Sequence, residues 1–157
     1  MSFDVLGRWV EDGTPPEASF RGFLAHAVAR IGLALIWLYL GLVPKLLVSH
    51  PEEQAPFLRA GFSDEAAGKA VVVLGVAEVA VGIALLTQWQ SSWLPYLAGL
   101  LPLVLTTGAV LSEPSVASGP YNPVVTTVGT VSLGIVAGYL AGDVPTAANC
   151  TRTPLEQ

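Results

Sequence analysis

The feature that most constrains this chain is a continuous apolar stretch over residues 31–48, IGLALIWLYLGLVPKLLV. With the apolar residues just before it, the segment 23–44 has the length of roughly 20 residues that a helix needs to cross a bilayer. The segment is hydrophobic on every side, so it either lies inside a large protein or faces lipid. A chain of 157 residues has no large interior. The segment is therefore predicted to be a transmembrane helix.

The composition of the whole chain agrees with a membrane protein of one domain. Hydrophobic residues make up 52% of the chain and charged residues 12%, against about 25% charged in an average soluble domain. The net charge of −5 argues against a nucleic-acid partner. The apolar composition makes the lipid bilayer the expected partner. Charged residues within the first 19 positions argue against a cleavable signal peptide.

Three further apolar segments follow the first. They cover residues 70–87, 93–111 and 123–142. Ser63 is placed to cap the second helix, and Trp89 and Trp93 flank the turn before the third, as aromatic residues do at a membrane boundary. The chain is thus divided into a polar or interfacial segment 1–22, a four-span membrane domain 23–142 and a polar tail 143–157.

Short connections between the four spans predict an all-α fold, an integral membrane four-helix antiparallel bundle that runs up-down-up-down. Between the first two spans we expect a short amphipathic helix that ends near Gly61, a residue suited to a helix C-terminus. Basic residues are slightly more numerous on the side of the termini: Arg8, Arg21, Arg30 and Arg152, against Lys45, Arg59 and Lys69. This bias favours a multi-pass protein of the cell (plasma or inner) membrane with cytoplasmic termini.

Glu78 is the most informative polar residue, because it lies in the middle of the second span. A carboxylate at that depth costs several kcal/mol unless it is paired or neutralised. Helical spacing places Gly75, Glu78, Gly82 and Leu85 on one face, which we expect to point into the bundle. A role in binding a ligand or a proton and a purely structural ion pair are both open.

The first span carries a second polar face. His26, Arg30, Trp37, Gly41 and Lys45 fall on one side of a 3.6-residue helix. Arg30 is a candidate partner for Glu78, although its position near the end of the span requires a fully extended side chain. Lys45, at the other end, is expected to meet one of the acids in or after the connecting segment: Glu52, Glu53, Asp64 or Glu65. Arg30 and Trp37 each have a structural alternative, as a boundary anchor and as a packing residue.

The side of the membrane opposite the termini collects the secondary candidates His50, Glu113 and Asn122. No metal site is expected, because the only cysteine, Cys150, lies in the tail and no Cys/His cluster suits zinc or an iron–sulfur centre. No two histidines lie on facing spans, which argues against haem.

Three sequence pieces, in this order, are similar to the DoxX-like family of membrane proteins. They are Arg30 with the apolar run into GLVPKL at 41–46, GVAE at 75–78 followed by Gly82, and Asn122-Pro123 at the start of the last span. The resemblance covers about residues 25–142 and implies four transmembrane helices. Its shared positions are Arg30, Lys45 and Glu78. The family's name-giving member is a subunit of a thiosulfate:quinone oxidoreductase, so the resemblance implies a link to redox chemistry and a quinone.

The leading hypothesis is a redox-associated membrane protein that binds quinone or another amphipathic small molecule within the bundle, with Glu78, Arg30, Lys45 and Trp37 as the candidate site. One alternative is a non-catalytic accessory subunit that packs against other membrane subunits or a second copy of the chain. Another is a small transporter or lipid-handling protein. Whether the chain is an enzyme is left open.

Overall fold

The computed structural model describes residues 10–11, 16–48, 51–112, 114–118 and 123–143. Four long helices account for most of them: α2 (Pro16–Gly41), α4 (Asp64–Thr87), α5 (Trp93–Ser112) and α6 (Pro123–Leu140). All four are long and apolar enough to cross a membrane. The part of the chain that the structure describes contains no strand, and the predicted all-α membrane bundle is confirmed. Most of the expected N-terminal interfacial segment and of the C-terminal tail lies outside the described residues.

Shorter helical elements complete the chain. Helix α2 continues into a π-helical turn, η1 (Leu42–Leu47), and the expected amphipathic piece is α3 (Pro51–Arg59). A 3-10 turn, η2 (Pro114–Ser118), lies between α5 and α6, and α6 runs into another, η3 (Ala141–Asp143).

The helix boundary signals between α3 and α4 are confirmed. The Ser63 hydroxyl accepts a hydrogen bond from the backbone N–H of Ala66 at 3.4 Å, as an N-cap residue does. Gly61 has a φ of +90°, a left-handed conformation that glycine adopts without steric cost. The chain therefore turns sharply between the short helix and the long one.

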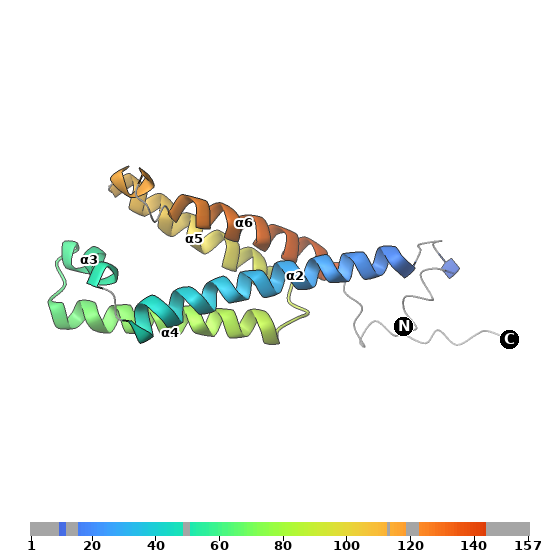
Figure 1. Cartoon of the computed structure of the whole chain (residues 1–157), viewed down its shortest axis with the longest axis horizontal. Coiled ribbons are helices and arrows are strands. Elements are labelled where there is room, and N and C mark those ends of the chain that lie inside the picture. The colour runs from blue at the N-terminus through green and yellow to red at the C-terminus, as the bar shows by residue number, and fades with distance from the viewer. Residues whose placement is uncertain (1–9, 12–15, 49–50, 113, 119–122, 144–157) are drawn as a thin grey trace.

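Helix α2 is the centre of the bundle. It packs against α4 on one side and α6 on another, and α5 packs mainly against α6. Helices α4 and α5 are consecutive but contact each other little, and the α2–α4 pair and the α5–α6 pair diverge toward the end where α3 lies (Figure 1). The core is consequently concentrated around α2.

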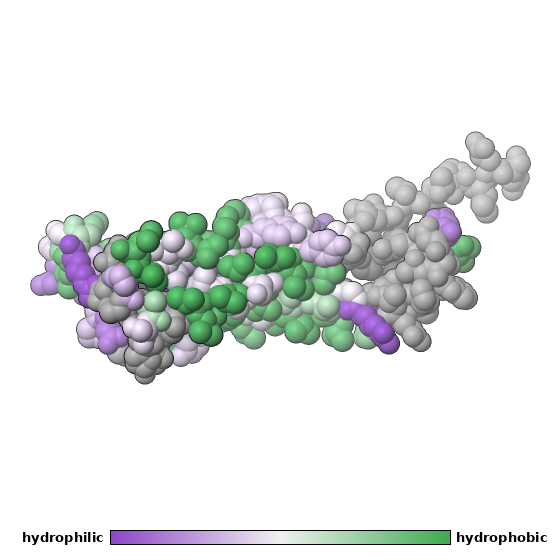
Figure 2. Space-filling view, turned by 90° about the horizontal axis from the view of Figure 1, so that it is seen from above, coloured by the Kyte–Doolittle hydropathy of each residue, from purple (hydrophilic) through white to green (hydrophobic). Residues whose placement is uncertain are grey.

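The surface of the described bundle is what a lipid environment requires. Many large apolar side chains are exposed, among them Val73, Val104 and Leu105. Apolar residues cover most of the middle of the molecule, while hydrophilic ones gather toward its ends (Figure 2). In water such a surface would be an aggregation hazard, but in a bilayer it faces acyl chains at no cost.

Candidate functional site

The candidate site begins at the point where α2 and α4 approach most closely. A Cβ atom built on Gly41 would lie 2.6 Å from the Gly75 carbonyl oxygen and 2.9 Å from the Glu78 Cβ atom. Both glycines are needed for this contact, because any larger residue would push the two backbones apart. The crossing brings the end of α2 next to the middle of α4. Lys45 and Glu78 lie on either side of it.

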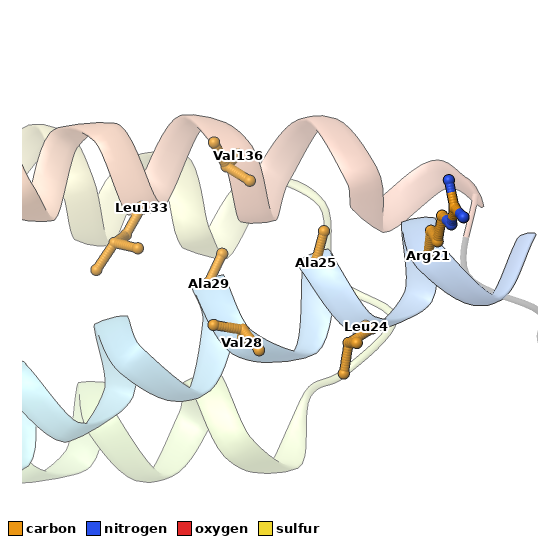
Figure 3. Close-up of a pocket in the computed structure, with 7 residues that line it drawn as sticks. All are labelled: Arg21, Leu24, Ala25, Val28, Ala29, Leu133 and Val136. Atoms are coloured by element: carbon orange, nitrogen blue, oxygen red, sulfur yellow. The ribbon is translucent and has the colours of Figure 1, made fainter. Parts of the chain in front are cut away.

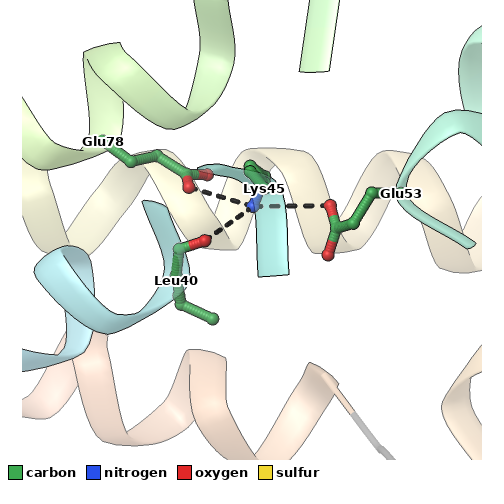
Figure 4. Close-up of polar contacts among 4 residues, drawn as sticks. All are labelled: Leu40, Lys45, Glu53 and Glu78. Atoms are coloured by element: carbon green, nitrogen blue, oxygen red, sulfur yellow. Dashed lines mark hydrogen bonds and ion pairs between the residues drawn. The ribbon is translucent and has the colours of Figure 1, made fainter. Parts of the chain in front are cut away.

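Lys45 uses its ammonium group to hold three oxygen atoms (Figure 4). Its Nζ atom lies 2.9 Å from Glu78 Oε2, 3.4 Å from Glu53 Oε2 and 3.2 Å from the carbonyl oxygen of Leu40. The contact with Leu40 is a hydrogen bond, whereas those with the two carboxylates are ion pairs, and Glu78 Oε2 has no hydrogen-bond partner among the described residues. The side chains of Lys45 and Glu78 are 7% and 11% exposed, while that of Glu53 is 33% exposed. Of the four acids expected to meet Lys45, the structure selects Glu53, from α3, and adds Glu78.

Pro44 explains why the Leu40 carbonyl can accept the hydrogen bond from Lys45. In an α-helix that carbonyl would accept the N–H of residue 44, and proline has no N–H. The backbone widens into the π-helical turn η1 at this place, and Val48 N–H donates to Val43 O, five residues back. The Pro44-Lys45 dipeptide thus both opens the helix and supplies the ammonium group that satisfies it.

The charges in this cluster do not balance. Two carboxylates, Glu53 and Glu78, face one ammonium group, so the cluster carries one excess negative charge when both acids are ionised. A proton or a hydrogen-bond donor from a ligand would relieve that excess. The arrangement can therefore accept a proton or bind a hydroxyl group, and Lys45 can donate to a carbonyl oxygen.

Arg30 does not pair with Glu78, and that suggested pairing is wrong. Its side chain is fully buried and binds backbone carbonyls at the end of α4 and in the following turn. The Nε atom donates to Leu85 O at 2.7 Å, Nη1 to Ser91 O at 2.9 Å, and Nη2 to Gln88 O. Glu78 lies about 10 Å before Leu85 along the helix, at the rise of an α-helix.

Two of the carbonyls that Arg30 binds, those of Leu85 and Ser91, lack a helical donor, while the carbonyl of Gln88 also accepts the Ser91 N–H at 3.0 Å. The last four carbonyls of α4 have no N–H from their own helix. Ser91 O lacks its helical donor because the residue four positions later is Pro95. A cation is also favoured at a helix C-terminus by the helix dipole. The Trp89 ring covers the guanidinium carbon at 5.6 Å from its centroid.

The ring nitrogens of Trp37 and His26 also contact backbone carbonyl oxygens of other helices. Trp37 Nε1 donates to the carbonyl oxygen of Ala98 at 3.1 Å, and the residue four positions after Ala98 is Pro102. His26 Nδ1 lies 3.0 Å from the carbonyl oxygen of Ala137, in the last turn of α6. The His26 ring meets the Trp89 ring edge-on, with 5.2 Å between the centroids.

The candidate residues therefore fall into separate groups. Lys45 and Glu78 are together at the α3 end of α2, Arg30 is at the opposite end, and Trp37 lies between them against α5. His50, Glu113 and Asn122 lie outside the described residues. Among the residues that are described, no three His, Cys, Asp or Glu side chains gather as a metal site would require.

Sequence reasoning missed the backbone carbonyls as partners. It looked for acids opposite each cation, whereas Arg30 binds only carbonyls and Lys45 binds one besides its two acids. For two of these carbonyls, those of Leu40 and Ser91, the sequence did contain a signal. A proline inside or at the start of a helix identifies the carbonyl four residues earlier as one that needs another donor.

The fold and the buried cluster define an integral membrane four-helix bundle with an ion pair between its first two spans. The chain belongs to the DoxX-like family, whose pattern it matches over residues 34–135. The matched range contains Trp37, Lys45 and Glu78 but begins after His26 and Arg30. No curated protein and no solved structure shows significant similarity to the chain.

Proposed function

We propose that this protein binds a quinone, or a similar amphipathic ring compound, beside Lys45 and Glu78. The observation that carries the proposal is the unbalanced cluster of Glu53, Lys45 and Glu78, in which Lys45 and Glu78 are nearly buried. Ionisable groups inside a membrane protein are costly and typically serve a ligand or proton pathway. A structural ion pair needs only one carboxylate, whereas this cluster has two.

The chemistry of the cluster suits both redox forms of a quinone. Lys45 is a donor for the carbonyl oxygen of the oxidised ring, and Glu78 is an acceptor for the hydroxyl group of the reduced one. The long isoprenoid tail would remain among the exposed apolar side chains.

A binding measurement in lipid nanodiscs tests the proposal. A short-chain ubiquinone analogue should quench the tryptophan fluorescence of the wild-type protein at saturating concentration. Glu78→Gln should weaken binding of the reduced analogue about tenfold or more, because a hydrogen bond to a charged group contributes about 1.5–3 kcal/mol.

Glu65→Gln is the matched control. Glu65 lies on the same helix and is also ion-paired, with Lys69 at 2.6 Å, but both side chains are largely exposed. We expect its affinity for the analogue to equal that of the wild type. Absence of saturable binding to the wild type, or equal affinities for all three proteins, would reject the proposal.

We further propose that the protein lies in the cell (plasma or inner) membrane with its termini in the cytoplasm. The side chains of Arg30 and Lys45 are buried and bound within the bundle, so they are left out of the count of surface charges. The basic residues that remain are Arg8, Arg21 and Arg152 on the side of the termini, against Arg59 and Lys69 on the other. The bias toward the termini supports this orientation.

A further inference from the structure

A groove between α2 and α6 combines an apolar floor with a single cation. It has a volume of about 450 Å³, is open along one side, and is lined by Arg21, Leu24, Ala25, Val28, Ala29, Leu133 and Val136 (Figure 3). The groove is shallow and widely open, so it suits a chain that lies along the surface of the bundle and not an enclosed small molecule. The groove lies at the end of the bundle remote from Lys45 and Glu78, so it is not part of the site described above.

The groove exists because α2 presents small side chains to α6 at this level. Ala25 and Ala29 occupy the floor, and the larger Leu133 and Val136 of α6 stand along one wall (Figure 3). Its lining is almost entirely apolar, so water gains no hydrogen bonds in it. An elongated hydrocarbon chain is the occupant that this lining fits.

Arg21 supplies the polar end of the groove. It lies one residue inside the start of the first membrane span, Phe20–Leu47, and its side chain is exposed. Among the side chains that the structure describes, no carboxylate pairs with it. Arginine binds phosphate with two parallel hydrogen bonds, and at the end of a span it meets the layer of lipid headgroups.

We propose that this groove binds one anionic phospholipid, with an acyl chain along Ala25 and Ala29 and the headgroup phosphate on Arg21. The exposed positive charge at one end and the apolar floor match the two parts of such a lipid. A membrane protein is surrounded by lipid everywhere, so the distinguishing claim is selectivity for a net negative headgroup at this one place.

Native mass spectrometry of the intact chain in a mild detergent tests the proposal. The probes are phosphatidylglycerol and phosphatidylcholine with the same acyl chains, which differ in net headgroup charge. We expect a first lipid to bind with about fivefold preference for phosphatidylglycerol, the effect of about one basic residue at an anionic membrane surface.

Two variants locate the site. Arg21→Gln should abolish the preference by weakening phosphatidylglycerol binding more than phosphatidylcholine binding, and Ala25→Leu should reduce binding of both lipids by filling the floor. Ala25 is exposed, so the larger side chain does not disturb the core. Lys69→Gln is the control, since it removes an exposed cation from α4 at the other end of the bundle and should retain the preference.

Equal retention of the two lipids by the wild type, or a preference that survives in Arg21→Gln, overturns the proposal. A preference lost equally in Lys69→Gln also overturns it, because the selectivity would then reflect net charge alone. Quinone binding at Lys45 and Glu78 has no bearing on any of these outcomes.

Discussion

At the scale of single residues, Lys45 is expected to contribute strongly to the stability of the bundle. Its ammonium group is within 3.4 Å of two carboxylate oxygens and bonds a carbonyl of its own helix. Glu53 is one-third exposed and keeps contact with the surroundings, whereas Glu78 depends on Lys45 for compensation. Removal of the lysine therefore affects the two acids unequally.

Lys45→Met should lower the free energy of unfolding by about 3–5 kcal/mol, the usual cost of leaving one member of a buried ion pair without its partner. The double variant Lys45→Met with Glu78→Gln should recover part of this loss, because no unpaired buried charge remains. Chemical unfolding in detergent micelles measures both effects.

Lys69→Met serves as the control for that experiment. Its ion pair with Glu65 is largely exposed, so the expected cost is about 0–1 kcal/mol. If Lys45→Met costs no more than Lys69→Met, the ion pair with Glu78 does not stabilise the fold.

At the scale of helices, prolines and polar side chains act in pairs. Pro44, Pro95 and Pro102 each leave the carbonyl four residues earlier without its helical donor. Each of these carbonyls, on Leu40, Ser91 and Ala98, accepts a hydrogen bond from a side chain of α2 or η1: Lys45, Arg30 and Trp37 respectively. In lipid no water is present to satisfy such groups, so the side chains replace it.

This pairing predicts that Trp37 and Pro102 are energetically coupled. Trp37→Phe should cost about 1–3 kcal/mol more than lost packing, because the buried Ala98 carbonyl loses its donor. In a Pro102→Ala background the backbone N–H at position 102 is restored and satisfies that carbonyl, so the same substitution should cost less. A double-mutant cycle of unfolding free energies measures the difference.

Trp93→Phe is the control for general effects of removing an indole. Trp93 is 59% exposed, at the start of α5. Its replacement should lower the free energy of unfolding only slightly, and by the same amount in the wild-type and Pro102→Ala backgrounds. Strict additivity of Trp37→Phe and Pro102→Ala would show that the proline-freed carbonyl is not what Trp37 serves.

The sequence was sufficient to predict the four helices and the inward face of α4, since these follow from apolar length and 3.6-residue periodicity. The buried residues of α4 form one line: Ala67, Val71, Gly75, Glu78, Gly82 and Leu85. The register between helices was not predictable in the same way. That register depends on the contact of Gly41 with Gly75, and it decides that Glu78 meets Lys45 and not Arg30. Glycine pairs at a crossing are visible in a sequence, but which glycines pair is decided by three-dimensional packing.

At the scale of the whole molecule, the orientation in the membrane can be read from one native residue. Cys150 is the only cysteine in the chain and belongs to the segment after the last span. With cytoplasmic termini, a membrane-impermeant maleimide should label Cys150 in permeabilised cells and not in intact ones. Labelling of intact cells would reverse the proposed orientation, and Cys150→Ser supplies the background signal.

The position of α2 at the centre of the bundle has a consequence for how the protein is made. Helix α2 and η1 are synthesised before the other spans, yet apart from the Leu40 carbonyl the described partners of His26, Arg30 and Lys45 belong to later segments. Those of Lys45 include Glu53 and Glu78, those of Arg30 lie between Leu85 and Ser91, and that of His26 is Ala137. An arginine or lysine inside a lone span costs several kcal/mol in lipid.

The α2–α4 hairpin with its closing turn is therefore the smallest unit in which Arg30 and Lys45 both have their partners. We expect α2 to remain beside the insertion machinery until α4 has emerged, and Nδ1 of His26 to gain its hydrogen-bond partner only when α6 arrives. The register that places Glu78 against Lys45 thus also fixes the order in which the helices leave that machinery for the bilayer.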